Sequence, residues 1–552
     1  MNFTKLTASA VALAFLTGCG GGGSSSPTPP AQPMSTNPPP PVQSATSTVI
    51  SGKVTFDRVP HTQSSSLDYA NTVQNPIRGV VIEAVNASGD VVSESVSDSQ
   101  GNYSLTVDSN TEIRLLVKAQ LFSDADAKWN FAVMDNTQGN QLYALQGSLA
   151  NAGPNSRQTR DLHAGHGWTG QSYGESRSAA PFAILDSVYD AVQAFTEVDP
   201  NIDFPALELR WSVNNKTQIG SRALGQIGTS AYFGDEDDGV IYLLGEEGRD
   251  TDEYDQHVIL HEWGHYFEDK LSRSDSIGGL HSLNDRLDAR VAFSEGWGNA
   301  LSAIITGDPI YRDSGGTQQA SGFSFNIETG NITNPGWFNE ASIGSIIYDI
   351  YDETSDPSDN ISAGLDPLYN VMRSDAYIDT PVFTTIFALA DGLRREAPEQ
   401  AATLNALLEN QSISGEGPNG NGEQNSGAIR SALPVYKEAS LNGAATQNCC
   451  VDDAGLFNKL GNREFIFLNL DSEQDVEMTL SKTQGDENRD PDFNIWQGNE
   501  LLHQARLAVR GEEIFETRLL AGGYVIEVFD FLNINGSGSR RGDSCYNFSV
   551  TG

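Results

Sequence analysis

The sequence is short of positive charge. It contains 33 Lys and Arg residues against 73 Asp and Glu residues, which gives a formal net charge of −40 at pH 7. A surplus of carboxylates on this scale repels phosphate groups, so it argues against nucleic acid and anionic membrane surfaces as binding partners. The charge by itself is typical of a highly soluble protein.

Long apolar runs are also missing. The interior of the chain has no stretch of about 18 apolar residues, the length that a helix needs to cross a bilayer, so we expect no spanning helix. The N-terminus has a short apolar run from Ala8 to Leu16, with one Lys before it and small residues after it. This pattern predicts an export signal rather than a membrane span.

The end of this signal carries the letters LTGC at residues 16–19, which resemble the lipobox of bacterial lipoproteins. The resemblance implies that residues 1–18 are removed as a signal peptide and that the sulfur of Cys19 is diacylated. Two acyl chains hold a protein stably on a bilayer. Gly20 rather than Asp follows the cysteine, which implies the outer membrane or cell surface of a Gram-negative cell. A plain secretory signal is the alternative.

Cysteine is scarce as well. Beyond Cys19 only Cys449, Cys450 and Cys545 occur. An exported protein can hold a disulfide. Because neighbouring cysteines rarely bond each other, we expect either Cys449 or Cys450 to pair with Cys545, and the sequence leaves open which one.

Composition divides the rest of the chain into segments. Residues 19–47 are rich in Gly, Ser and Pro and predict a tether. Residues 151–175 are rich in Gly, Asn, Ser and Arg and predict a linker. Between about 176 and 435 helical stripes alternate with short strands. From 440 to 552 strand patterns return and predict a β-sandwich.

Residues 48–150 consist of short β-branched runs and predict a second β-sandwich. Both predicted sandwiches resemble known modules. Residues 48–150 resemble the transthyretin-like modules attached to carboxypeptidases in Gly79 before a strand, then Asp98, Gly101 and Tyr103. In the C-terminal segment the letters DPDFNIW and LLAGGYVIEV resemble the pre-peptidase C-terminal domain of secreted bacterial proteases.

Histidine is rare, with eight in the chain, yet two lie four residues apart in HEWGH at 261–265. On a helix His261 and His265 share one face, so both imidazoles can reach a single metal ion. Glu262 lies too far round the helix to be an equal ligand, but it can accept a proton from a metal-activated water. Acidic residues before the motif suit a helix N-terminus.

A third ligand has three candidates. A nearby histidine in the pattern HExxHxxGxxH is excluded because position 271 is Leu. His281 has no such motif around it. The remaining candidate is Glu295, in the predicted helix AFSEGWGNALS that follows. Asn299 lies one helical turn further on, where its amide could hydrogen-bond a ligating histidine and fix its tautomer.

An HExxH motif followed by a glutamate on a second helix resembles the gluzincin pattern. The letters HEWGH and EGW resemble the fungalysin-type metallopeptidases, although Asn299 replaces that family's acidic residue. The resemblance implies one catalytic Zn²⁺ held by His261, His265 and Glu295, with Glu262 as general base and acid. The implied fold is multidomain, with an α+β zincin-type metallopeptidase core flanked by two β-sandwich domains. The implied function is a zinc metalloendopeptidase that acts on proteins or peptides.

The sequence does not identify the group that stabilises the oxyanion. Thermolysin-like enzymes use a histidine after the glutamate ligand, but the only histidine after Glu295 is His503, in the C-terminal sandwich. Tyr348 is a candidate phenolic donor. A packed helix aromatic is the alternative interpretation of Tyr348.

Other features have two interpretations each. Residues 239–245 predict a strand, which is either a substrate-binding edge strand or an interior strand. The acidic stretch 235–255 could bind Ca²⁺ or form a solvated loop. His257, His163 and His166 are interpreted as structural histidines rather than ligands.

Two further functions compete with the endopeptidase. One is a surface binding or adhesion protein built on an inactive zincin core, which the flanking sandwiches and the missing histidine favour. The other is an aminopeptidase, for which the sequence offers no motif that would hold a free amine.

Overall fold

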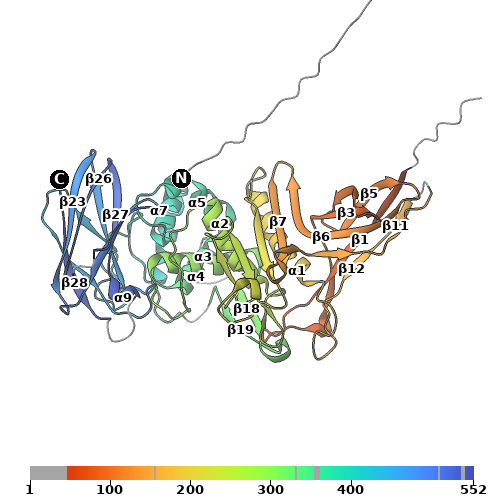
Figure 1. Cartoon of the computed structure of the whole chain (residues 1–552). Coiled ribbons are helices and arrows are strands. Elements are labelled where there is room, and N and C mark those ends of the chain that lie inside the picture. The colour runs from red at the N-terminus through yellow and green to blue at the C-terminus, as the bar shows by residue number, and fades with distance from the viewer. Residues whose placement is uncertain (1–46, 155–156, 330–331, 353–360, 508–509, 536–540) are drawn as a thin grey trace, which may run out of the picture. The chain divides into compact units, whose positions relative to one another are not determined.

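The computed structural model describes residues 47–552 apart from 155–156, 330–331, 353–360, 508–509 and 536–540 (Figure 1). The expected signal peptide, Cys19 and the tether up to residue 46 lie outside the described residues. No helix in the described part of the chain is both long and apolar enough to cross a bilayer.

Strand β1 (Ser47–Arg58) is the centre of the first sheet. It pairs antiparallel with β5 (Asn102–Asp108), and buried and exposed side chains alternate along β5, as in a strand with one face on a core. Strands β11 (Arg157–Thr159) and β12 (Leu162–Ala164) pair with β1 in parallel. Both lie within the expected linker 151–175, so this stretch is part of the N-terminal β region rather than free chain.

A second sheet joins the N-terminal region to the segment that carries the HEWGH motif. Its main path has the order β14-β15-β13-β7-β6-β3-β4. Its N-terminal members are β3 (Val80–Asn86), β4 (Val91–Val96), β6 (Glu112–Asp124) and β7 (Lys128–Asp135). Strand β7 pairs in parallel with β13 (Leu207–Trp211). The predicted N-terminal sandwich and the predicted peptidase segment therefore share one continuous sheet.

The strand before the HEWGH helix is an interior strand. Strand β15 (Val240–Leu243) lies between β13 and the antiparallel strand β14 (Ala231–Phe233). The edge-strand interpretation of residues 239–245 is therefore wrong. Among the described strands, β14 ends the sheet on this side and leaves one backbone edge unpaired.

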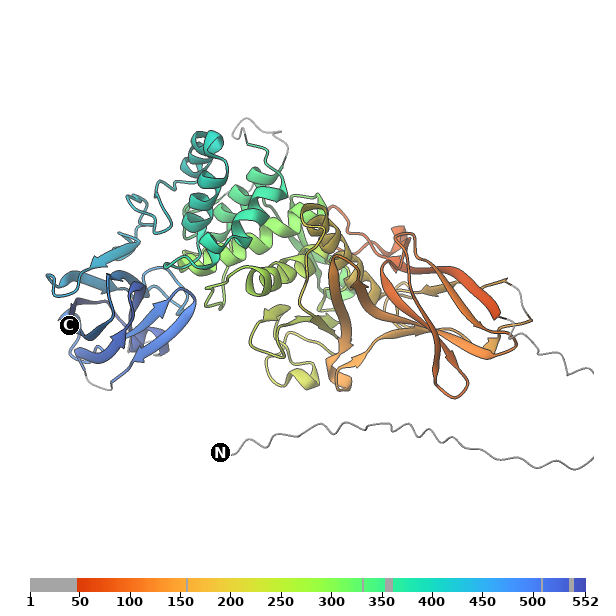
Figure 2. The ribbon, with the colours of Figure 1, turned by 90° about the horizontal axis from the view of Figure 1, so that it is seen from above.

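The helical pattern predicted between about 176 and 435 is confirmed, and five longer helices form one group with three shorter ones (Figure 2). The longer helices are α1 (Ala180–Val198), α2 (Gln256–Leu271), α3 (Ala289–Thr306), α4 (Glu340–Tyr351) and α7 (Ile386–Glu396). The others are α5 (Leu365–Arg373), α6 (Asp375–Ile378) and α8 (Ala401–Asn410). Both α2 and α3 are buried along most of their length, because α3 packs between α2 and α4.

Glycines set the close approach of these three helices. A Cβ on Gly264 of α2 would lie 3.1 Å from the Cα of Gly298 on α3. A Cβ on Gly298 would lie 2.9 Å from Nδ1 of His261, and one on Gly296 would lie 2.5 Å from Cβ of Ile343 on α4. Larger residues would push the helices apart, so the glycines of HEWGH and EGWGN bring the two motifs together.

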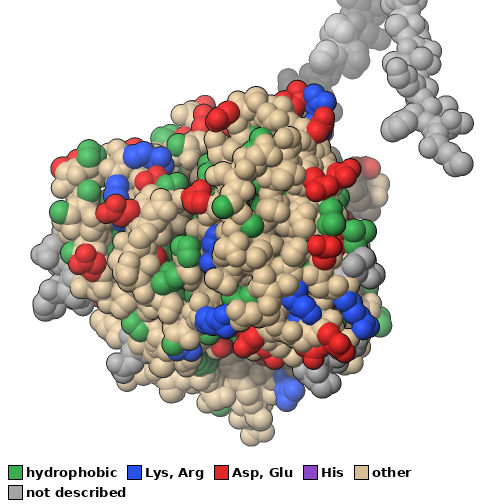
Figure 3. All heavy atoms as spheres, turned by 90° about the vertical axis from the view of Figure 1, so that its left-hand side faces the viewer, with side chains coloured by type: hydrophobic (Ala, Val, Ile, Leu, Met, Phe, Trp, Pro, Cys, Tyr) green, Lys and Arg blue, Asp and Glu red, His purple; other side chains and the backbone are tan. Residues whose placement is uncertain are grey.

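The C-terminal region is a two-sheet β-sandwich with its own hydrophobic core, and the predicted strands in it are confirmed. One sheet has the order β20 (Tyr436–Ala439), β22 (Arg463–Leu470), β27 (Gly522–Asp530), β24 (Pro491–Gln497) and β25 (Glu500–Ala505). The other has the order β21 (Thr446–Val451), β28 (Ser544–Thr551), β23 (Gln474–Gln484) and β26 (Glu512–Leu519). A disulfide between Cys450 and Cys545 joins β21 (Thr446–Val451) to β28 (Ser544–Thr551), and Cys449 is a buried free thiol. This confirms that one of the adjacent cysteines pairs with Cys545. Acidic and basic side chains are interspersed on the face seen in Figure 3.

A buried ion pair connects this sandwich to the helices. Arg290, in the first turn of α3, donates a hydrogen bond of 2.8 Å to Glu527 of β27 (Gly522–Asp530). Arg463 also contacts Glu527, at 2.8 Å. Burial alone would raise the pKa of Glu527, but the two guanidinium charges outweigh it and lower the pKa to about 2.

Candidate metal centre

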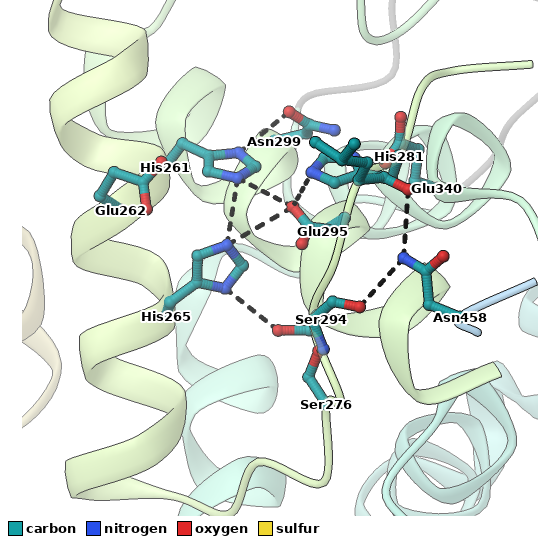
Figure 4. A network of polar contacts seen from close by, with 12 residues as sticks. His261, Glu262, His265, Ser276, His281, Ser294, Glu295, Asn299, Glu340 and Asn458 are labelled. Atoms are coloured by element: carbon teal, nitrogen blue, oxygen red, sulfur yellow. Dashed lines mark hydrogen bonds and ion pairs between the residues drawn. The ribbon is translucent and has the colours of Figure 1, made fainter. Parts of the chain in front are cut away.

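Three side chains from α2 and α3 converge in one buried site (Figure 4). Nε2 of His261 lies 3.1 Å from Nε2 of His265 and 3.1 Å from Oε2 of Glu295. Nε2 of His265 lies 3.5 Å from the same Glu295 oxygen. The structure thus brings together the three residues that the sequence predicts as ligands.

The outer nitrogens of both imidazoles are held by hydrogen bonds. Nδ1 of His261 lies 3.1 Å from Oδ1 of Asn299, which can only accept, so Nδ1 carries the proton. Nδ1 of His265 lies 3.0 Å from the hydroxyl of Ser294, and that hydroxyl donates to Glu268 at 2.6 Å. It therefore accepts from Nδ1–H. Sequence reasoning found Asn299 but missed Ser294 and Glu268, since a serine beside a glutamate ligand is no motif by itself.

With the protons on Nδ1, the Nε2 atoms of His261 and His265 face into the site. If both rings are neutral, the two Nε2 lone pairs and the Glu295 carboxylate face one another. Burial would raise the pKa of Glu295, but His265, His261 and His281 hold it well below its usual range. Burial would lower the pKa of His265, but the charge of Glu295 raises it. The site therefore stabilises a positive charge, either a proton or a metal ion.

The spacing of the three donor atoms suits zinc. In a tetrahedral site with ligands about 2.0–2.2 Å from zinc, neighbouring ligand atoms lie about 3.3–3.6 Å apart. The observed separations of 3.1, 3.1 and 3.5 Å are close to that range. Two neutral imidazoles and one carboxylate are also a donor set that zinc commonly takes.

Glu262 is held by the edge strand rather than by the triad. Its carboxylate is largely buried, and Oε2 accepts a hydrogen bond of 2.8 Å from the backbone N–H of Tyr232 on β14. It projects from α2 beside His261, on the side away from Asn299 (Figure 4). The carboxylate is therefore next to the triad and next to the outer edge of β14.

A second triad shares Glu295 and was not expected from the sequence. Nε2 of His281 lies 3.2 Å from Oε2 of Glu295, and Nδ1 lies 2.6 Å from Oε2 of the buried Glu340. Burial would lower the pKa of His281, but the hydrogen bond with Glu340 and the charges of Glu295 and Glu340 raise it to about 9. His281 comes from the loop between α2 and α3, where no sequence motif marks it.

Tyr348 does not join either triad. It lies on α4 with its ring 6.2 Å from that of Tyr351, and burial raises its pKa to about 12. Within the described residues no hydrogen bond or ion pair connects Tyr348 to the triads. His503 lies in the C-terminal sandwich, 3.0 Å from the hydroxyl of Thr517, far along the chain from the helices that hold the triads.

Three of the other histidines, which the sequence predicts to be structural, have partners outside the triads. Nε2 of His257 lies 3.0 Å from the backbone oxygen of Asp308. His163 and His166 both approach the carboxylate of Asp57, at 3.1 and 3.8 Å. These contacts fit the structural interpretation of all three.

The acidic stretch 235–255 divides into two parts. Its first part pairs with arginine: Glu236 contacts Arg210 at 3.0 Å. In its second part the carboxylates of Asp250 and Asp252 lie close to that of Asp313, within 4.8 Å of one another. Calcium binding there stays a prediction.

Comparison with known proteins places a peptidase-related region over this site. The family model of the Mycolysin C-terminal domain, a domain found in zinc metallopeptidases, matches residues 217–378. That range covers less than a third of the chain, and it contains every residue of the two triads. The chain therefore has a region similar to a peptidase-related domain. No curated protein matches the chain significantly.

Two solved structures match about a fifth of the chain. The pre-peptidase C-terminal domain of collagenase from Bacillus anthracis is 14% identical, with 21% of this chain and 93% of that chain covered and a TM-score of 0.16. PliG from Aeromonas hydrophila, a periplasmic inhibitor of g-type lysozyme, is 17% identical, with 21% and 96% covered and a TM-score of 0.13. Scores this low assign no fold.

Proposed function

We propose that the protein is a zinc-dependent endopeptidase whose metal is held by His261, His265 and Glu295. The observation that carries the proposal is the convergence of their three donor atoms at 3.1–3.5 Å. Hydrogen bonds at Nδ1 fix the orientation of both imidazoles. When bound, zinc would lower the pKa of a water toward neutrality and polarise the scissile carbonyl.

Glu262 then acts as general base and acid. Its carboxylate takes a proton from the attacking water and delivers it to the leaving amine. The backbone N–H of Tyr232 steadies the carboxylate for this exchange, at 2.8 Å. Because Tyr232 belongs to the edge strand β14, an extended peptide paired with that edge would pass beside Glu262.

His281 supplies the donor that the sequence left open. Glu340 anchors Nδ1, so Nε2 points towards Glu295 and the centre of the site. In that position Nε2–H can donate a hydrogen bond to the carbonyl oxygen as negative charge develops on it. We propose His281 for this role in place of Tyr348, which contacts neither triad.

Two variants test the metal and the base separately. Glu262→Gln should keep one zinc per chain and lower hydrolysis of unfolded casein by about 10²–10⁴-fold. Glu295→Ala should lose most of its zinc, measured by atomic absorption after dialysis. Full activity in Glu262→Gln would refute the mechanism. Casein hydrolysis that is absent from the unmodified, zinc-loaded chain would instead favour the adhesion protein.

A second pair of variants tests whether His281 is the hydrogen-bond donor to the oxyanion. His281→Ala should lower kcat by about 10²–10³-fold with zinc content unchanged, since one oxyanion donor is lost. Tyr348→Phe removes only a hydroxyl and should keep kcat. The reverse pattern would reassign the donor to Tyr348.

Export and lipidation complete the proposal. The LTGC letters at 16–19 support a lipid anchor at Cys19, which would place the enzyme at the outer membrane or cell surface. Mass spectrometry of the membrane-extracted protein should show a chain that begins at Cys19 and carries the added acyl mass. A chain without acyl groups would support the secretory alternative.

A further inference from the structure

The loop that presents His281 is held mainly by contacts with other segments of the chain. It comprises residues 272–288, joins α2 to α3, and contains no helix (the His281 loop). Just before His281 the backbone N–H of Gly278 bonds Oγ of Ser276 at 3.3 Å, and Gly278 and Gly279 both have positive φ. Glycines in this conformation do not by themselves fix a path, so other groups must hold the backbone in place.

Asn339, at the start of α4, holds the backbone after His281, whereas the groups that hold the backbone before it come from the C-terminal region. Nδ2 of the fully buried Asn458 donates to the backbone oxygens of Gly278 at 3.0 Å and Leu280 at 3.2 Å (Figure 4). Nζ of Lys459 donates to the same Leu280 oxygen at 2.6 Å and pairs with Asp285 at 3.1 Å. The backbone of residues 278–280, immediately before His281, is thus bonded to two side chains about 180 positions later in the sequence.

Backbone bonds extend the contact. The N–H of Leu460 bonds the oxygen of Arg286 at 2.9 Å, and the N–H of Asp288 bonds the oxygen of Asn458 at 2.9 Å. A Cβ on Gly279 would lie 2.7 Å from the ring of Phe457, so the two segments touch closely. Residues 457–460 (the contact segment) lead directly into β22 (Arg463–Leu470) of the sandwich.

We propose that the contact segment positions His281 for catalysis, with Asn458 and Lys459 as the positioning residues. The proposal rests on the peptidase function above. The C-terminal sandwich then acts as part of the active site, because it fixes the backbone of residues 278–280 while Glu340 fixes the imidazole of His281. A displacement of the His281 backbone by about 1 Å would take Nε2 out of hydrogen-bond range of the reacting oxygen.

The test compares Asn458→Ala with Asn469→Ala, which removes an exposed amide from β22. Asn458→Ala should lower kcat about tenfold, with KM and zinc content unchanged, and Asn469→Ala should not. In a His281→Ala background, Asn458→Ala should have no further effect, because both changes remove the same interaction. An equal loss in both backgrounds would overturn the proposal.

Lys459 provides a second variant in case Asn458→Ala unfolds. Lys459→Ala should lower kcat, and Lys459→Arg should restore most of it by donating to the same oxygen. Hydrogen exchange gives a readout that needs no activity: the amides of Asp288 and Leu460, which bond across the contact, should exchange faster in Asn458→Ala and at an unchanged rate in Asn469→Ala. Unaltered exchange there would overturn the positioning role even if the unmodified chain were inactive, whereas inactivity with altered exchange would refute the peptidase function alone.

Discussion

Gly298→Ala should separate the metal site from the stability of the fold. In the helix interior alanine is favoured over glycine by about 1 kcal/mol. The new Cβ would lie 2.9 Å from Nδ1 of His261 and 3.0 Å from its Cε1, where ordinary contacts begin at 3.4 Å. The imidazole of His261 must therefore shift by about half an ångström, which is about the largest displacement that a metal-binding side chain tolerates.

We expect this shift to weaken zinc binding more than folding. The strained contact costs about 1–3 kcal/mol, which offsets the helix gain, so the Tm should change by only a few degrees. Displacing His261 from Asn299 should weaken zinc affinity by about 10–100-fold. Competition with a fluorescent chelator measures the affinity, and calorimetry measures the Tm.

The matched control is Gly344→Ala on α4. Its Cβ would meet only ordinary contacts, at 3.4 Å from the backbone oxygen of Gly296 and 3.6 Å from Cβ of Asn299. It should raise the Tm and leave zinc affinity unchanged. If Gly298→Ala bound zinc as tightly as Gly344→Ala, the close contact with His261 would not govern the site.

Three further outcomes follow from the structure. Asn299→Asp should tighten zinc binding severalfold in the same chelator assay, because a carboxylate behind His261 makes the ring a stronger ligand. Replacing Cys450 and Cys545 by serine should destabilise the C-terminal sandwich by about 2–4 kcal/mol in urea unfolding, because the disulfide closes a long loop. The pKa of Glu527 is lowered on folding to about 2, so its stabilising contribution is present above its unfolded pKa and is lost as pH falls from about 4.5 to 2. Glu527→Gln should flatten that part of the pH–stability curve, and a curve parallel to that of the unmodified protein would contradict the assignment.

The sequence predicts the helical half of the site well. His261, His265, Glu295 and Asn299 lie on two helices, and helical periodicity alone decides which side chains share a face. The glycines that bring the helices together are visible in the same motifs. A local pattern therefore contains most of the information needed for the first triad.

The second triad could not be found in this way. His281 lies in a loop, and its position depends on Glu340 from another helix and on Asn458 from the C-terminal region. Contacts between segments so far apart in the chain produce no periodic pattern in the sequence. The same holds for residues 157–164, whose Gly- and Asn-rich surroundings predict a linker although they pair with β1.

The sheet that runs from β4 through β7 and β13 to β14 has a consequence for maturation. A protease that cut between residues 151 and 175 would break one covalent link but would leave the β7–β13 backbone hydrogen bonds intact. The fragments would separate on a denaturing gel and elute as one particle from a sizing column. Cleavage in this stretch would therefore nick the protein without releasing its N-terminal strands.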